Sequence, residues 1–263
     1  MIPKVIHYCW FGNNTKSKLI KDCISSWKKF LPDYEIIEWN ESNTDLSHPF
    51  LIEAYKQKKW AFVSDWIRLK VLYEYGGVYL DTDMMMLKKI DDLLNFRCFF
   101  GAEDLEFISC GIIGAEKKND FIKKCFNFYF ESNFFDDDSI KMNTIPRIVT
   151  KIFKEEYSFS GSFGDLIVDN DLAIFPSVFF YPFPFDESKN NSKYKEFIKE
   201  ESFTVHLWNS SWIEYTEFYY LRKKEYRKGL SIVMRNIFLE KKVSLKYLIK
   251  IASCFKESVC YEK

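Results

Sequence analysis

The stretch AFVSDWIRLKVLYEYGGVYLDTDMMM, residues 61–86, decides the fold of this chain. Its apolar residues first recur at the spacing of an α-helix, and Ser64 is the candidate N-cap of that helix. Gly76 and Gly77 are typical of a helix C-terminus. A β-prone run at residues 78–80 leads directly into Asp81 and Asp83. Open α/β sheets bind their ligands at the carboxyl ends of their strands, and the two acidic residues lie at such an end.

The spacing of Asp81 and Asp83 predicts a metal site. In an extended chain, residues two apart point to the same side, so the two carboxylates can converge. Neighbouring carboxylates repel each other unless a divalent cation lies near them. Oxygen ligands suit Mg²⁺ or Mn²⁺, which take further ligands from water and substrate phosphates. A short D-x-D pattern taken alone is more often an ordinary acidic turn, and the helix, the double glycine and the strand before it favour the metal site instead.

The composition is that of a globular protein without a charge excess. Of 263 residues, 47% are hydrophobic, and Lys plus Arg number 38, as do Asp plus Glu. This balance does not predict nucleic acid as a partner. The seven cysteines include no C-x-x-C pair and are expected to be reduced thiols. The chain opens with β-prone residues instead of a signal region, so a cytoplasmic protein is expected.

The rest of the chain predicts a Rossmann-like α/β domain followed by a helical segment. Strands are expected at residues 4–11, 34–39, 99–101, 109–115 and 203–207, and helices at 17–31, 50–58 and 120–132. The run FPSVFFYPFPF at residues 175–185 holds three prolines and is expected to be a loop or a sheet edge. Residues 214–263 carry twelve basic and six acidic residues with interleaved apolar ones. We expect this basic amphipathic segment either to pack on the domain or to contact an anionic membrane surface.

Three segments of the chain resemble family 32 glycosyltransferases, the DXD sugar transferases that include capsular-polysaccharide enzymes and fungal α-1,6-mannosyltransferases. These segments are PKVIHYCWFG from residue 3, SDWIRLKVLYEYGGVYLDTD from residue 64 and HLWNSSW from residue 206. The glucosyltransferase domain of the large clostridial toxins is more distantly similar. The resemblance implies a GT-A-like catalytic domain with a mixed central sheet over residues 1–212 and a helical appendage over residues 213–263.

The same resemblance assigns residues to the donor. It implies that Trp10 stacks on the nucleotide base, although an indole at a strand end also suits a core. Asp65 and Arg68, three residues apart on a helix, would contact ribose or sugar hydroxyls, and a plain surface ion pair fits their spacing as well. Tyr79 would lie beside the nucleotide sugar or serve only as a strand residue.

The implied metal site combines Asp83 as a direct ligand with Asp81, which would contact the metal or the ribose. His206 would supply a nitrogen ligand to Mn²⁺, and the alternative is a structural histidine. Ser211 and Trp212 would close over the diphosphate, because a hydroxyl and an indole N–H both donate to phosphate oxygens. The metal would stabilise charge on the leaving diphosphate.

The expected activity is transfer of a hexose or N-acetylhexosamine from a nucleotide diphosphate sugar, with a UDP-sugar favoured over a GDP-sugar. The resemblance implies retention of anomeric configuration, a glycan or lipid-linked oligosaccharide acceptor, and a part in bacterial surface polysaccharide synthesis. Glu103 or Asp104, at a strand end, could meet the acceptor. Two alternatives stay open: an effector-type enzyme that modifies a protein, and a non-catalytic module that binds nucleotide sugars or carbohydrate.

Overall fold

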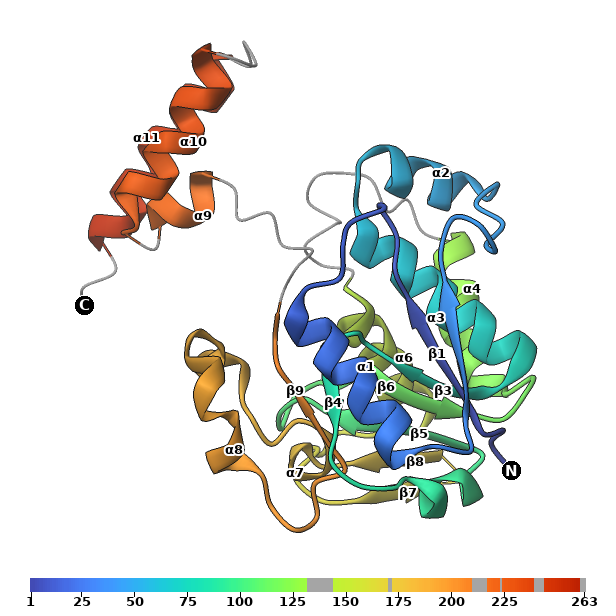
Figure 1. Ribbon diagram of the computed structural model, residues 1–263. Coiled ribbons are helices and arrows are strands. Elements are labelled where there is room, and N and C mark those ends of the chain that lie inside the picture. The colour runs from blue at the N-terminus through green and yellow to red at the C-terminus, as the bar shows by residue number, and fades with distance from the viewer. Residues whose placement is uncertain (132–143, 170–171, 210–216, 223, 239–243, 261–263) are drawn as a thin grey trace. The chain divides into compact units, whose positions relative to one another are not determined.

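The computed structural model describes residues 1–131, 144–169, 172–209, 217–222, 224–238 and 244–260 (Figure 1). The chain divides into two units, Met1–Asn209 and Ser210–Lys263. The predicted boundary after residue 212 falls in 210–216, outside the described residues, so the limits of the two domains stay a prediction. Among the described residues, no helix has the length and apolar character needed to cross a bilayer.

A mixed seven-stranded sheet in the order β2-β1-β3-β6-β5-β8-β7 forms the centre of the first unit (Figure 1). Its strands are β1 (Val5–Cys9), β2 (Glu35–Trp39), β3 (Gly77–Leu80), β5 (Cys98–Ala102), β6 (Ile108–Ala115), β7 (Ile167–Asp169) and β8 (Leu172–Phe175). β2, β1 and β3 are parallel, β5 and β8 run in the same direction, and β6 and β7 are antiparallel to their neighbours. The predicted α/β fold with a mixed central sheet is confirmed.

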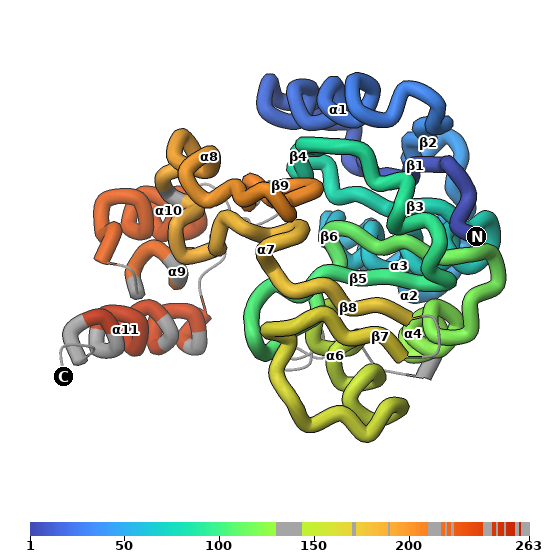
Figure 2. Tube along the Cα trace, turned by 90° about the horizontal axis from the view of Figure 1, so that it is seen from below, coloured from blue at the N-terminus to red at the C-terminus, as the bar shows by residue number. Residues whose placement is uncertain are grey.

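Two hydrophobic cores cover the two faces of this sheet. The helices of the first unit are α1 (Lys18–Phe30), α2 (Pro49–Lys56), α3 (Trp60–Tyr75), α4 (Asp120–Glu131), α6 (Ile145–Glu156), α7 (Ser177–Phe180) and α8 (Tyr194–Phe197), with 3₁₀ turns η1 (Asp91–Asn95) and η2 (Phe185–Lys193). Tyr79 belongs to the core under α2, α3, α4 and α6, whereas Val78 and Leu80 belong to the core that contains Trp27 of α1. Figure 2 shows α1 on one side of the strands. The alternation along β3 is that of a strand buried on both faces.

The central helix α3 differs from the prediction at its start. It begins at Trp60 with Lys59 as its N-cap, so Ser64 lies inside the helix. The Ser64 hydroxyl donates to the carbonyl of Trp60 at 2.9 Å, a local bond that serine forms within helices. The predicted C-terminus is confirmed: Gly76 and Gly77 have φ angles of 71° and 114°. A Cβ on Gly77 would lie 2.7 Å from the Val5 carbonyl oxygen, so only glycine lets β3 start against β1.

A small second sheet was not predicted. β9 (Thr204–His206), expected as the last strand, pairs with β4 (Met84–Met86) in an antiparallel ladder that sets Met84 opposite His206. This pairing brings residues after the acidic pair next to a segment about 120 residues further along the chain.

The proline-rich aromatic run is partly helical instead of a loop. Phe175 ends β8, Pro176 is the N-cap of α7, and the side chains of Phe180, Tyr181 and Phe183 are buried.

The second unit is helical, as predicted. It consists of α9 (Glu217–Arg222), α10 (Tyr226–Phe238) and α11 (Leu245–Cys260). Leu221, Val233 and Cys254, one from each helix, form its buried core.

The cysteines whose side chains the structure describes are buried, and their reduced state stays a prediction. The buried cysteines are Cys9, Cys23, Cys98, Cys110, Cys125 and Cys254.

His7 is the structural histidine that joins β1 to the turn before β3. It is fully buried, its Nε2 donates to the Gly76 carbonyl at 2.8 Å, and its Nδ1 accepts from Trp39 Nε1 at 3.1 Å. Both ring nitrogens are therefore satisfied in the neutral tautomer. Burial lowers the pKa of His7 below 6.5, and the bond to Gly76 only partly opposes that effect.

Acid is expected to destabilise the protein through His7. Because the folded-state pKa lies below the unfolded value of 6.5, the stabilisation by neutral His7 is complete above that pH and is lost as the pH falls through the lowered pKa. His7→Gln cannot titrate, so its Tm should be lower than that of the wild type at pH 8 but should fall less steeply between pH 7 and 5. Thermal unfolding followed by circular dichroism tests this. A Tm difference that is constant across that range would contradict the assignment.

Candidate functional site

Three parallel strands end at one edge of the sheet, and each is followed by a candidate site residue. Trp10 follows β1, Asn40 follows β2, and Asp81 follows β3. β1 pairs in parallel with both neighbours, so the three carboxyl ends meet at the same edge. Ligands of open α/β sheets bind at this edge.

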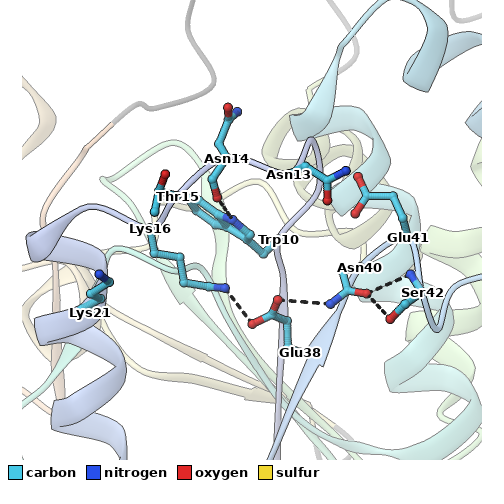
Figure 3. A pocket seen from close by; sticks show the side chains of 10 residues that line it. All are labelled: Trp10, Asn13, Asn14, Thr15, Lys16, Lys21, Glu38, Asn40, Glu41 and Ser42. Atoms are coloured by element: carbon cyan, nitrogen blue, oxygen red, sulfur yellow. Dashed lines mark hydrogen bonds and ion pairs between the residues drawn. The ribbon is translucent and has the colours of Figure 1, made fainter.

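A cavity of about 570 Å³ lies at the ends of β1 and β2 (Figure 3). Its lining residues are Trp10, Asn13, Asn14, Thr15, Lys16, Lys21, Glu38, Asn40, Glu41 and Ser42. The half-buried Trp10 offers its ring and not its N–H group, because Nε1 donates to the Asn14 carbonyl at 2.7 Å. Lys16 Nζ lies 5.2 Å from the Trp10 ring centroid and 2.8 Å from Glu38 Oε2. Asp81 and Asp83 do not line this cavity but follow the adjacent strand.

The chain from Asp81 to Met84 forms a turn and is not extended, so the premise of the spacing argument was wrong. Met84 N donates to the Asp81 carbonyl at 3.0 Å and closes this turn. The two carboxylates are consequently held by different partners, Asp81 by residues of α3 and β3 and Asp83 by residues of β9 and the segment that follows it.

Asp81 Oδ1 is held in place by two neighbours. It accepts from the Tyr79 hydroxyl at 3.1 Å and pairs with Arg68 Nη2 at 3.2 Å. Oδ2 faces Gly111 of β6: a Cβ there would lie 3.3 Å from Oδ2 and 3.1 Å from the Tyr181 hydroxyl. A side chain at Gly111 would therefore crowd the Asp81 oxygen that Arg68 does not use.

Asp65 and Arg68 form a buried ion pair and not the surface pair that their spacing also allowed. Arg68 Nη2 lies 3.0 Å from Asp65 Oδ1, with 6% and 9% of the two side chains exposed. Arg68 Nη1 also donates to the Cys110 carbonyl at 2.7 Å, and the guanidinium lies 4.5 Å from the Tyr79 ring centroid. Burial raises the pKa of Asp65 to about 7, although the charge of Arg68 opposes the shift. Through these contacts Arg68 links α3 to Asp81. The expected contacts of Asp65, Arg68 and Tyr79 with the donor stay predictions.

Asp83 is held by His206 and Asn209. His206 Nε2 donates to Asp83 Oδ1 at 3.0 Å, and the amide of Asn209 donates to Oδ2 at 2.8 Å. Burial opposes ionisation of Asp83, but the charge and hydrogen bond of His206 outweigh it and lower the pKa of the carboxyl. Burial likewise acts to lower the pKa of His206, and the charge of Asp83 raises it overall.

The contact with Asp83 changes what His206 can do for a metal. Its Nε2 is already committed to the carboxylate. Its buried Nδ1 has no hydrogen-bond partner among the residues that the structure describes. Only Nδ1 is left for a further ligand, and the predicted ligation by His206 stays a prediction.

The donor set fits a hard divalent cation that is completed by its substrate. No group of three or more His, Cys, Asp and Glu side chains in the described part of the chain could hold a metal by itself. Asp81 Oδ2 beside Gly111, together with the ionised Asp83, supplies carboxylate oxygens. Mg²⁺ and Mn²⁺ accept such partial protein ligation and fill the other positions with water and phosphate oxygens.

Other side chains complete the surroundings. Glu103 follows β5, its side chain bonds to Ser109, and burial raises its pKa while the charge of nearby His206 opposes the shift. Sequence reasoning named Glu103 but missed Gly111 and Tyr181. Tyr181 was hidden within an aromatic run, and nothing in the sequence distinguished Gly111. The predicted diphosphate contacts Ser211 and Trp212 lie outside the described residues.

A comparison with protein families matches part of this edge of the sheet. Residues 17–100 match the family model "Glycosyltransferase sugar-binding region containing DXD motif". Asp81, Thr82 and Asp83 form the D-x-D within that region. The match also includes α1, β2, α3 and β3, whereas the cavity residues Trp10, Asn13, Asn14, Thr15 and Lys16 lie before it. The finer resemblance to family 32 stays a prediction.

Several curated relatives are glycosyltransferases by name. The chain is 29% identical over 147 residues to inositol phosphoceramide mannosyltransferase 3 of Schizosaccharomyces pombe, covering 49% of this chain and 40% of that protein. It is 30% identical over 155 residues to lactosylceramide 4-alpha-galactosyltransferase of Mus musculus, covering 56% and 40%. The chain thus spans less than half the length of these relatives. Among solved structures, a PaToxG glycosyltransferase is similar with 16% identity and a TM-score of 0.48, covering 98% of this chain and 86% of that one.

Loss of the Arg68 guanidinium is expected to destabilise the first unit. Arg68→Met would leave Asp65 buried without its partner and the Cys110 carbonyl without its donor, and breaking a buried pair costs about 3–5 kcal/mol. Urea unfolding measures the change. Lys151→Met, which removes an exposed pair with Glu155, is the matched control and should change stability little. Equal losses in the two variants would show that the buried network does not stabilise the fold.

Proposed function

We propose that this chain is a metal-dependent glycosyltransferase. It transfers a hexose or N-acetylhexosamine from a nucleotide diphosphate sugar to a glycan or lipid-linked oligosaccharide. One observation carries the proposal: a cavity with an aromatic side chain and the acidic turn of a DXD region lie at neighbouring strand ends of one sheet edge. A non-catalytic module would need the cavity alone, whereas the acidic pair suits a cation that grips a diphosphate.

The donor fits this edge with its base at Trp10 and its diphosphate at the acidic turn. The cavity extends over the ends of β1 and β2, and Asp81 follows β3, the strand on the other side of β1. The far side of the cavity at β2 and the turn after β3 are two strand spacings apart, about 10 Å, a length that a nucleoside diphosphate can span. An indole face suits stacking by a base. A UDP-sugar is the favoured donor and a GDP-sugar the alternative.

The chain's own residues hold the acidic pair in place. His206 and the Asn209 amide hold Asp83, and Tyr79 and Arg68 hold one oxygen of Asp81. Carboxylates fixed in this way are preorganised for a cation, so little reorganisation is needed during the reaction. When bound, Mg²⁺ or Mn²⁺ supplies Lewis-acid stabilisation of charge on the leaving diphosphate.

The acceptor and pathway follow from the resemblance and from the relatives. The two relatives are named for inositol phosphoceramide and lactosylceramide, both ceramide lipids by name, which supports a lipid-linked acceptor here. Glu103 is the candidate carboxylate for contact with an acceptor hydroxyl. Its side chain interacts electrostatically with His206, which holds Asp83. Retention of configuration, bacterial surface polysaccharide synthesis and a cytoplasmic location complete the proposal.

Loss of the Asp83 carboxylate is expected to abolish most donor turnover. Asp83→Asn keeps the shape of the side chain but removes a charge next to the cation, and removal of one group that stabilises developing charge costs about 10²–10³-fold in rate. Release of UDP or GDP from a panel of nucleotide sugars, with and without Mn²⁺, measures this. Asp165→Asn, at an exposed position, should be as active as the wild type. Hydrolysis at the wild-type rate in Asp83→Asn would overturn the catalytic assignment.

The Trp10 ring is expected to contribute directly to nucleotide affinity. Trp10→Leu keeps an apolar side chain but removes the stacking surface, which is worth about 1–3 kcal/mol per base. Isothermal titration with UDP and with GDP in the presence of Mn²⁺ measures the loss. Phe185→Leu, a partly exposed aromatic position, is the control and should bind normally. Unchanged affinity in Trp10→Leu would show that the base binds elsewhere.

A further inference from the structure

Helices α10 and α11 leave large apolar side chains exposed in addition to those in their own core. The core of the second unit uses Val233 of α10 and Cys254 of α11. The exposed residues are Leu230 (43%), Met234 (53%), Phe238 (68%), Leu245 (75%), Leu248 (45%) and Ile249 (57%). We call these six residues the hairpin face. Large exposed apolar residues gathered in a small helical unit mark an interaction surface.

Side-chain contacts fix how the three helices of this unit are arranged. α10 and α11 are antiparallel, since Tyr226 stacks on Phe255 at 5.4 Å and Asn236 Nδ2 donates to the Tyr247 hydroxyl at 3.1 Å. α9 contacts both of them (Figure 2). A Cβ on Gly229 of α10 would lie 2.9 Å from Leu221 of α9, so Gly229 marks the side of α10 that faces α9.

The apolar stripe on α10 is turned away from α9. Successive residues of a helix are rotated by about 100°. Leu230, Met234 and Phe238 therefore lie about 100°, 140° and 180° from Gly229 around the axis. Around the α10 axis, these three residues lie in the same direction from Gly229 as Tyr226, the residue that contacts α11. The stripe therefore begins beside that contact and continues onto the side of α10 opposite α9.

The stripe on α11 has the same orientation. Tyr247 faces α9, because its ring lies 5.6 Å from that of Phe218. Leu248 lies about 100° from Tyr247, and Leu245 and Ile249 each lie about 160° from it. Both stripes are therefore on the side of the α10–α11 hairpin opposite α9, where they form one apolar surface.

The charge of this segment indicates what covers the hairpin face. Residues 214–263 hold twelve basic and six acidic residues, whereas residues 1–213 hold 26 and 32. Exposed Arg227 lies about 160° from Gly229 and so falls within the arc of the α10 stripe. A second copy of the same unit would bring together two segments that each carry an excess of basic residues, which like charges oppose. An anionic lipid surface satisfies both features, because its headgroups attract the basic residues and its acyl boundary accepts the apolar ones.

We propose that the hairpin face binds the surface of an anionic lipid bilayer. α10 and α11 lie flat on the membrane, with their six apolar side chains at the acyl boundary and Arg227 among the lipid phosphates. The proposal rests on the second unit alone and is independent of the glycosyltransferase assignment.

Vesicle sedimentation with the full chain tests the proposal. The wild type should sediment with phosphatidylcholine vesicles that contain about a third phosphatidylglycerol, far less with phosphatidylcholine alone, and less again as salt is raised. The double variant Met234→Gln, Phe238→Gln should lower the bound fraction by about tenfold, and Leu248→Gln on α11 is the independent second variant. Ile52→Gln, which alters an exposed apolar residue of α2, is the control and should bind like the wild type.

Three results would overturn the proposal. The first is wild-type protein that stays in the supernatant with anionic vesicles. The second is equal vesicle binding by the wild type, the double variant and Leu248→Gln, with circular dichroism showing that the variants are folded. The third is a dimer in light scattering that the double variant dissociates, since a second copy would then occupy the hairpin face.

Discussion

The first unit is organised around the buried guanidinium of Arg68. A charge removed from water must find partners in the protein, and Arg68 finds Asp65 in its own helix, the Cys110 carbonyl in β6 and Asp81 after β3. These contacts fix both the rotation of α3 and its position along the sheet. Arg68 therefore contacts the acidic turn and also anchors α3, the helix before it. Through this one side chain, the packing of the core affects the geometry of the candidate site.

Asp81 and Asp83 depend on different parts of the fold although they are two residues apart. Asp81 is oriented through Tyr79, whose ring belongs to the core under α3. Asp83 is oriented by His206, which β9 places there by pairing with β4 on the other side of the sheet. The spacing of the carboxylates is thus set by two separately packed cores. A change in either core that shifts one carboxylate by a fraction of an ångström would alter cation affinity without touching a ligand.

Local patterns allowed the sheet, the glycine turn and the strand before the acidic pair to be predicted, because each is set by neighbouring residues. Gly76 and Gly77 are an example, since their positive φ angles require glycine whatever packs around them. What depends on distant contacts was not predicted. The i, i+3 spacing of Asp65 and Arg68 fits an exposed pair and a buried one equally, and only the Cys110 carbonyl decides between them. Serine is a common N-cap residue, so Ser64 was a plausible start of the helix. The helix instead begins earlier, at Trp60, which packs against the main core.

The geometry of Trp10 limits how a nucleotide could be distinguished at this edge. Its N–H group is bonded to the Asn14 carbonyl, so the ring is what remains for a ligand, and every base has a face that stacks. Under the proposed function, discrimination between uracil and guanine therefore falls to the polar groups around the ring. Glu38 and Asn40 are bonded to each other, and Glu41 Oε1 already accepts from the Gly12 amide and the Tyr55 hydroxyl. These bonds fix the rim before a ligand arrives, so selectivity for the base would reside in a preformed pattern contributed mainly by the end of β2.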